Sequence, residues 1–261
     1  MSLVWPVLFA VFVWWFSTGL ILLLDNLPHR TFRWSLFVSS LLAASALTAL
    51  AHTANQTGAS AAYCAFTCAL LVWGWHELSF LTGWVTGPRK TATPPGASDA
   101  VRFRHAVQAI LWHELGIIAV GLSIVALTWG APNQVGTWTF VVLWVMRTSA
   151  KLNLFLGVRN LSEEFLPEHL KYLASFFRRK PMNLLFPFSV TASTVVAVLM
   201  IAVAREAPVE QATGLLLVAT MLVLAIVEHW LLVLPLPATA LWRWAMRRDA
   251  QPAPEALLHA R

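Results

Sequence analysis

Three adjacent pairs of histidine and glutamate lie inside the most apolar parts of this sequence. The pairs are His76–Glu77, His113–Glu114 and, in the reverse order, Glu228–His229. Imidazole and carboxylate groups together suit iron, zinc or manganese, so the six side chains are candidate metal ligands. The same groups can also form ion pairs and hydrogen bonds with one another. Which chemistry applies depends on the elements that position them.

The composition of the chain is that of an integral membrane protein. Of its 261 residues 58% are hydrophobic and only 11% are charged, whereas about 25% are charged in a typical soluble domain. The mean hydropathy is +0.68. Its natural environment is therefore expected to be the lipid bilayer.

Seven apolar runs are long enough to cross a membrane, since a hydrocarbon core of about 30 Å needs roughly 20 residues of helix. They predict an all-α polytopic helix bundle that forms one domain over residues 1–240, followed by a flexible cytoplasmic tail over 241–261. The predicted spans are 3–24, 34–52, 60–86, 105–129, 135–157, 183–204 and 213–236.

The segment 160–181 differs from the seven spans because polar and apolar residues alternate along it. Leu166, Leu170 and Leu173 recur at helical spacing, which predicts an amphipathic helix lying on the membrane surface. Pro181 is expected to end this helix.

Lysine and arginine are concentrated in the loops on one side of the predicted bundle. The positive-inside rule therefore places the N-terminus outside and the C-terminus in the cytoplasm. That orientation requires an odd number of spans and agrees with seven. The net charge of +6 thus reflects topology and attraction to anionic lipid headgroups, and no nucleic-acid partner is expected.

The predicted spans bring several ionisable residues to a similar depth. Glu77 and Glu114 lie about ten residues, or roughly 15 Å, from the cytoplasmic ends of their spans, and Glu228 lies roughly 12 Å deep. Arg147 and Lys151 occur four residues apart on the fifth span, at a comparable level. Because each such group costs about 2.5–3.5 kcal/mol in lipid, we expect them to meet inside the bundle.

Three interpretations of this polar layer remain open from the residues alone. In the first, Arg147 and Lys151 neutralise two of the three glutamates in an ion-pair network. In the second, the layer holds a transition metal. In the third, it belongs to a pocket for a pigment or small ligand that uses one histidine. The deeper tryptophans would line that pocket: Trp73, Trp75, Trp112, Trp144 and Trp230.

The metal interpretation has a specific ligand set, namely the three histidine–glutamate pairs. Carboxylate-bridged di-iron bundles place Glu and His three residues apart, so that both leave one helix face. Here the members of each pair are adjacent and diverge by about 100°, and two nearby cations would repel a dinuclear metal. Glu163, Glu164 and His169 on the surface segment are a candidate cap for such a site.

Several long blocks of the chain resemble the PuhE family, described as photosynthetic complex assembly protein 2 of purple phototrophic bacteria. The resemblance covers roughly residues 60–200. The blocks are "HELSFLTGWVTGPRK", "LTWGAPNQVGTWTF", "RTSAKLNLFLGVRNLSEEFLPEHLKYLASFFRRKPMN" and "FPFSVT".

The resemblance implies a protein of the bacterial inner, photosynthetic intracytoplasmic membrane. It also implies a role in assembling the reaction centre–light-harvesting 1 complex and an effect on bacteriochlorophyll supply. The family offers no catalytic residues to carry over, so enzymatic activity stays open.

Two functional hypotheses follow, with a transporter as a third, since charged residues inside the membrane also mark ion pathways. One is a non-enzymatic assembly factor that binds reaction-centre or light-harvesting 1 subunits or bacteriochlorophyll, with segment 160–181 as its docking surface. The other is a membrane metalloenzyme that modifies a pigment or isoprenoid.

Overall fold

The computed structural model describes residues 3–236 and 238–246. It confirms the all-α fold, because seven long apolar helices account for the predicted spans and the described residues contain no β-strand. The helices are α1 (Val4–Asp25), α2 (His29–Thr53), α3 (Ala59–Leu81), α4 (Asp99–Leu127), α5 (Val135–Leu156), α6 (Leu185–Glu206) and α7 (Val209–Val233).

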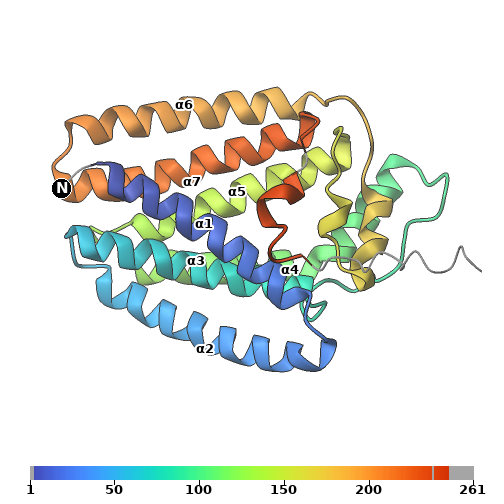
Figure 1. Cartoon of the computed structure of the whole chain (residues 1–261), viewed down its shortest axis with the longest axis horizontal. Coiled ribbons are helices and arrows are strands. Elements are labelled where there is room, and N and C mark those ends of the chain that lie inside the picture. The colour runs from blue at the N-terminus through green and yellow to red at the C-terminus, as the bar shows by residue number, and fades with distance from the viewer. Residues whose placement is uncertain (1–2, 237, 247–261) are drawn as a thin grey trace, which may run out of the picture.

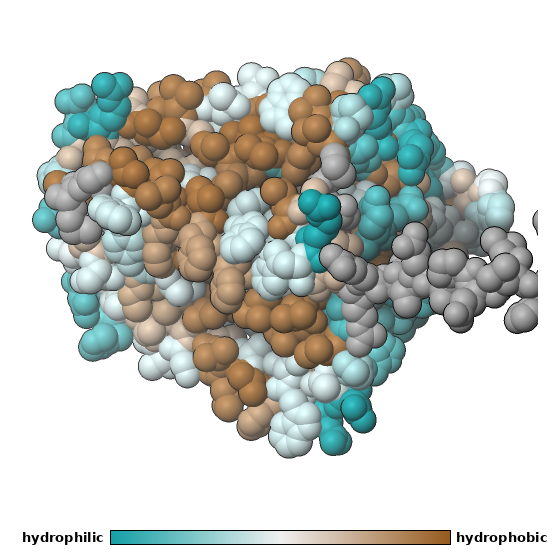
Figure 2. Space-filling model, in the orientation of Figure 1, coloured by the Kyte–Doolittle hydropathy of each residue, from teal (hydrophilic) through white to brown (hydrophobic). Residues whose placement is uncertain are grey.

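The helices run alternately in opposite directions along the long axis of the molecule (Figure 1). The α1–α2, α3–α4 and α5–α6 connections lie at the end where α7 finishes, together with residues 234–236 and 238–246. We call this end the basic end, because these connections carry most of the predicted cytoplasmic charge. Apolar side chains cover the middle of the visible face and hydrophilic ones gather at both ends (Figure 2), as expected for a bundle that spans a bilayer.

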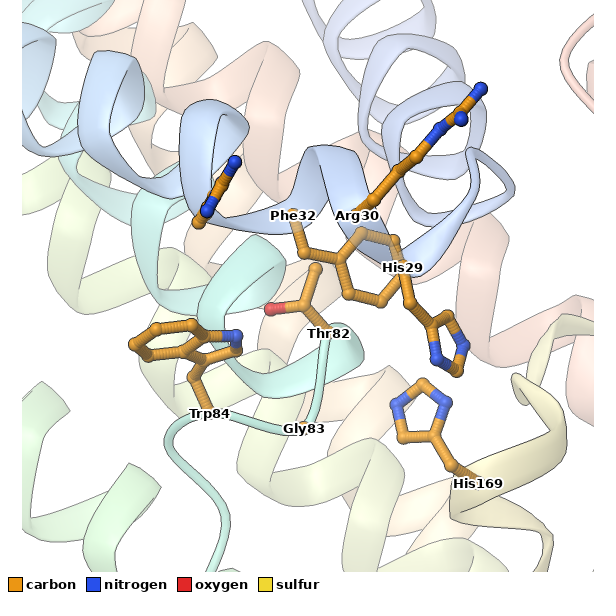
Figure 3. A pocket seen from close by; sticks show the side chains of 8 residues that line it. His29, Arg30, Phe32, Thr82, Gly83, Trp84 and His169 are labelled. Carbon is orange, nitrogen blue, oxygen red and sulfur yellow. The ribbon is translucent and has the colours of Figure 1, made fainter.

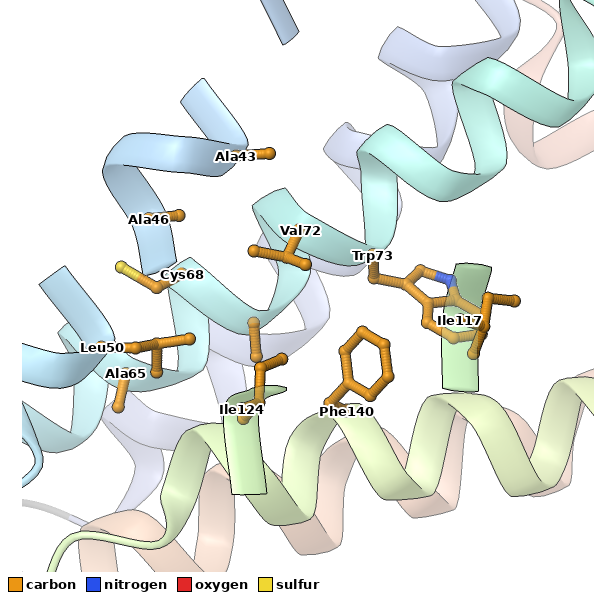
Figure 4. Packing of buried hydrophobic residues seen from close by; sticks show 11 residues of the cluster. Ala43, Ala46, Leu50, Ala65, Cys68, Val72, Trp73, Ile117, Ile124 and Phe140 are labelled. Carbon is orange, nitrogen blue, oxygen red and sulfur yellow. The ribbon is translucent and has the colours of Figure 1, made fainter. Parts of the chain in front are cut away.

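Helix α3 is the centre of the bundle. Within its most apolar window 67% of the residues are buried, against 17–22% in α1, α2, α4, α5 and α6. Small residues such as Ala46 on α2 and Ala65 on α3 let the two helices approach closely (Figure 4). On the opposite side, Trp73 meets Phe140 of α5 edge-to-face at 5.5 Å. The His76–Glu77 pair is therefore placed in the interior.

The predicted amphipathic helix over 160–181 is neither continuous nor an α-helix. The structure has instead two short 3₁₀ segments, η1 (Glu163–Phe165) and η2 (Glu168–Phe176), with Ser162 in the left-handed region at φ 53°. Pro167 separates them, because proline lacks an N–H and disfavours helical backbone in the residue before it. Beyond η2 the chain is extended, and Val158 pairs with Arg178 and Lys180 through backbone hydrogen bonds of 3.1 Å.

The apolar side of this segment faces the protein. Leu170, Leu173 and Phe176 are buried against Phe80 of α3 and Ala109 of α4. These side chains are consequently not free to dock a partner or to insert into the membrane.

The beginning of the predicted tail is ordered against α1. The 3₁₀ segment η3 (Ala238–Trp242) follows α7, and the Trp242 indole N–H donates to the backbone oxygen of Trp15 at 3.0 Å. The Trp15 indole N–H in turn donates to Leu241 O at 3.0 Å. Residues 241–246 of the predicted tail are thus held by contacts with α1, and the remainder, 247–261, lies outside the described residues.

The loop after α3 lies directly on α4. A Cβ added to Gly87 would fall 2.0 Å from the backbone oxygen of Gln108 and 2.7 Å from Ala109 C. The neighbouring Thr86 O accepts a 2.9 Å hydrogen bond from His113 N–H, which anchors the loop. Only glycine allows this approach.

We therefore expect Gly87→Ala to lower the free energy of unfolding by about 1–3 kcal/mol, the usual cost of overpacking. Thermal unfolding in detergent measures the change. Gly74→Ala is the matched control, because its added Cβ meets only Ile21 Cδ1 at an ordinary 3.7 Å. Equal stability of the two variants would show that the loop can move away without cost.

Candidate functional site

Helix α5 supplies both cations of the intramembrane layer. Arg147 and Lys151 lie four residues apart, so they leave the same side of the helix. The Arg147 Nη2 atom lies 3.1 Å from Glu77 Oε2 on α3, and Lys151 Nζ lies 2.5 Å from Glu114 Oε1 on α4. Two ion pairs therefore connect three helices, which is the arrangement that the network interpretation predicts.

Glu228 on α7 is held differently from the other two glutamates. Its Oε1 atom accepts a 2.9 Å hydrogen bond from the indole N–H of Trp14 on α1. No lysine or arginine among the described residues forms a salt bridge with it, although Arg147 is close enough for electrostatic attraction. Glu228 thus extends the layer to α1 and α7.

The layer is closed on one side and open on the other. The Glu77 side chain is only 11% exposed, whereas that of Arg147 is 44% exposed and Glu228 is also exposed. We call Trp14, Arg147 and Glu228 the open edge. This edge is the part of the layer that a ligand can reach.

His76 and His113 are buried without hydrogen-bond partners for most of their ring nitrogens. Both nitrogens of His76 and Nδ1 of His113 contact no donor or acceptor in the described part of the chain. The two ring centroids are 6.3 Å apart, and Phe80 lies 4.6 Å from the His113 ring. Because an unsatisfied buried polar group costs about 1–3 kcal/mol, these imidazoles are a feature that packing alone does not explain.

His229 belongs to a separate hydrogen-bonded group. Its Nδ1–H donates to Ala225 O at 2.8 Å, which leaves Nε2 to accept from the Ser149 hydroxyl at 2.9 Å. The Ser149 and Ser189 hydroxyls are also 2.9 Å apart, so the group joins α5, α6 and α7. Adjacent helix residues diverge by about 100°, and His229 therefore points away from Glu228.

The six predicted metal ligands consequently do not converge on one centre. Within residues 3–236 and 238–246, no three His, Cys, Asp or Glu side chains are grouped so that they could hold a metal ion. Glu77 and Glu114 are already paired with cations. The metal interpretation lacks a ligand set in this arrangement.

The predicted cap residues lie at the basic end and serve other contacts. Glu163 is 3.9 Å from Arg179, and Glu164 is exposed. The His169 Nε2–H donates to Leu81 O at 2.8 Å. Burial lowers the pKa of His169 below its usual range, so the ring is neutral at pH 7. None of these contacts joins the ion pairs.

Sequence reasoning missed three participants in the polar groups. Trp14 was hidden by the apolar character of the first span, since only its indole N–H is polar. Ser149 lies between the two cations in the sequence, and its position in an apolar run was a usable signal. Ser189 on α6 has no charged residue beside it in the sequence that would have drawn attention to it.

Fold and site together define a polytopic helical membrane protein with an internal ion-pair layer. The chain belongs to the DUF3623 family, described as "Protein of unknown function", whose model matches residues 1–253. A relative from Rhodobacter capsulatus is 41% identical over 249 residues, which cover 94% of this chain and 91% of the relative. Its name is "Uncharacterized 30.4 kDa protein in puhA 5'region". No solved structure matches the chain.

Replacing Arg147 with methionine would leave the enclosed Glu77 carboxylate without its cation. We expect Arg147→Met to cost about 3 kcal/mol of unfolding free energy, as for other broken buried pairs. Glu77→Gln should cost less, because the exposed Arg147 retains Glu228 nearby, and the double variant should recover part of the single loss. Reversible unfolding in mixed detergent micelles completes the double-mutant cycle.

Arg205→Met, at an exposed position on the last turn of α6, is the control for removing an arginine. Strict additivity of the Arg147 and Glu77 effects would contradict coupling between the two side chains.

Because the six candidate ligands do not converge on one centre, we also predict a low metal content. Protein purified without chelators should contain far less than one iron, manganese or zinc per chain, and EDTA should not change its thermal unfolding midpoint. Elemental analysis measures this directly. A stoichiometric metal that is lost in His113→Ala but kept in His52→Ala, a position near the end of α2, would restore the metal interpretation.

Proposed function

We propose that this protein is a non-enzymatic membrane factor that supports assembly of the photosynthetic reaction centre–light-harvesting 1 complex. One support is the Rhodobacter capsulatus relative, whose name places it in the puhA 5' region, a photosynthesis gene region. A second is the resemblance of the blocks within roughly residues 60–200 to the PuhE family. The phototroph's inner, intracytoplasmic membrane is then the proposed location.

The geometric observation that supports a binding role is the state of the carboxylates. Glu77 and Glu114 are paired with Arg147 and Lys151 across helices, so they position α3, α4 and α5 and are not free ligands for a reactive metal. What remains accessible is the open edge, where a guanidinium, a carboxyl group and the Trp14 indole lie together within the span.

Such an edge suits a ligand that is apolar except for a few polar groups. A charged donor inside the membrane forms stronger hydrogen bonds than a neutral one, and helices associate in lipid through packing and interhelical hydrogen bonds. A carbonyl of bacteriochlorophyll or a polar residue of a nascent subunit helix meets these requirements. We propose these two ligand classes for the open edge.

The buried histidines are less suited to a pigment. His76 and His113 are 0% and 1% exposed, and aromatic side chains surround them. A flat macrocycle could reach their nitrogens only if these helices separated. We therefore assign the proposed pigment or subunit contact to the open edge.

The orientation of the molecule in the membrane is part of the proposal. The basic end carries the predicted cytoplasmic charge, and we infer that it faces the cytoplasm. The N-terminus is then outside and the C-terminus inside. The open edge lies in the cytoplasmic half of the bilayer.

One observation favours a second candidate, the metalloenzyme that modifies a pigment or isoprenoid. The unpartnered nitrogens of His76 and His113 point to chemistry that packing does not account for. Two imidazoles alone do not complete a catalytic metal site, which usually has three protein ligands. The metal analysis described above separates this candidate from the assembly factor.

The assembly role predicts a defect that depends on the open edge. In Rhodobacter capsulatus lacking the related gene, the near-infrared absorbance of the reaction centre–light-harvesting 1 complex should fall severalfold, and expression of this chain should restore it. Glu228→Gln should restore it only partly, because the amide still accepts from Trp14 but lacks the negative charge. The absorbance of isolated membranes, normalised to the amount of this protein on an immunoblot, measures the effect.

Glu210→Gln, an exposed acidic position in the first turn of α7, is the matched control and should restore the complex fully. A deletion strain with unchanged complex content would overturn the proposed function. Full restoration by Glu228→Gln would overturn only the role proposed for the open edge and would leave the assembly function standing.

A further inference from the structure

A pocket at the basic end is separate from the ion-pair layer. It has a volume of about 580 Å³ and lies between the start of α2, the turn after α3 and η2 (Figure 3). His29 and His169 lie on one side of it and Trp84 on the other. Arg30, Arg33 and Gly83 also line it, and its lining includes no acidic residue. The pocket is thus positively charged.

The two arginines of this pocket are not neutralised by the protein. Neither Arg30 nor Arg33 forms a salt bridge within the described ranges, and the Arg33 guanidinium lies 5.5 Å from the Trp34 ring centroid. Other cations at the basic end do have acidic partners, as Arg178 has in Asp99. Arginine matches the geometry of phosphate oxygens through paired hydrogen bonds. The free guanidinium groups therefore favour a phosphate ligand.

The wall of the pocket is built by specific contacts. His169 is fixed by its hydrogen bond to Leu81 O and packs on Gly83, whose φ of +79° favours glycine. A Cβ added to Gly83 would lie 3.0 Å from the His169 ring. The His29 ring meets the His169 ring edge-to-face at 5.7 Å. These contacts hold the two histidines together against the turn after α3.

An apolar stripe continues from the pocket along α2. Arg33, Phe37 and Leu41 recur every four residues, so they lie on one side of the helix over roughly 12 Å. Phe37 and Leu41 are 56% and 55% exposed. Trp34 and Trp84 are also exposed, as tryptophans at a membrane interface often are. A ligand with an anionic head and an apolar chain would fit both the positively charged pocket and the apolar stripe on α2.

We propose that this pocket binds the phosphate group of an anionic phospholipid, with one acyl chain along the Arg33–Phe37–Leu41 stripe. The arginines bind the phosphate oxygens, and Trp84 lies at the level of the glycerol backbone. This proposal does not depend on the assembly function, because it uses none of the residues of the open edge.

The experiment is native mass spectrometry of the purified full-length protein titrated with phosphatidylglycerol. Wild-type protein should bind the first phosphatidylglycerol molecule more tightly than phosphatidylcholine. Arg30→Gln combined with Arg33→Gln should weaken that first binding step roughly thirtyfold, as expected for the loss of two arginine contacts near the membrane surface. Arg104→Gln combined with Arg159→Gln removes two exposed charges outside the pocket and should have little effect.

Two results of this titration would overturn the proposal. An equal loss in both double variants would indicate attraction by the overall charge rather than by a site. Competition by inorganic phosphate at concentrations similar to those of phosphatidylglycerol would indicate a soluble phosphate ligand instead of a lipid.

A second measurement needs no variant and so does not depend on the folding of one. A photoactivatable phosphatidylglycerol, incorporated into nanodiscs with wild-type protein, should crosslink to peptides that contain the start of α2 and residues 82–84. Crosslinks found only elsewhere on the bundle would contradict the assigned site.

Discussion

The pairing of charge inside an apolar bundle is the constraint on which the rest of this structure depends. An isolated ion in hydrocarbon is so costly that Arg147 and Lys151 must meet carboxylates. Because both cations lie on α5, this helix fixes the positions of α3 through Glu77 and of α4 through Glu114. Buried ion pairs often add little net stability compared with apolar residues. Their contribution here is to specify that α5 lies beside α3 and α4, and at which position along their axes these helices meet.

The buried histidines do not need such pairing, because a neutral imidazole can be buried without a counter-charge. His229 satisfies both ring nitrogens through Ala225 O and Ser149. His76 and His113 do not, and they lie among aromatic rings next to the ion pairs. Glu77 and Glu114 therefore serve the architecture of the bundle, while these two imidazoles are polar groups that the architecture does not explain. The repeated His-Glu pattern thus combines residues with separate roles.

Much of the fold could be predicted from the sequence, because membrane spans depend on length and apolarity, which are local properties. The seven helices lie close to the predicted runs, and Glu77 and Glu114 are paired with the two cations, as expected for residues that meet inside the bundle. The direction of side chains could not be obtained in this way. It depends on the rotation of each helix, which turns His229 toward Ser149 and brings Trp14 to the layer. The irregular backbone of segment 160–181 was not predicted, because its apolar residues recur at helical spacing. Pro167 nevertheless interrupts the helix.

The exposure of the layer changes across the bundle, and this gradient restricts where a ligand can act. Glu77, at the centre, is enclosed by helices that the ion pairs hold in place, whereas the Arg147 side chain is 44% exposed. Helix α1 is attached to the layer by the Trp14–Glu228 hydrogen bond, and Trp242 packs on Trp14 at 5.4 Å. A ligand at the open edge would therefore lie beside α1, α5 and α7, the helices that carry its three residues. The open edge thus combines Arg147, on the helix that the ion pairs hold in place, with Trp14 and Glu228, which a hydrogen bond joins across α1 and α7.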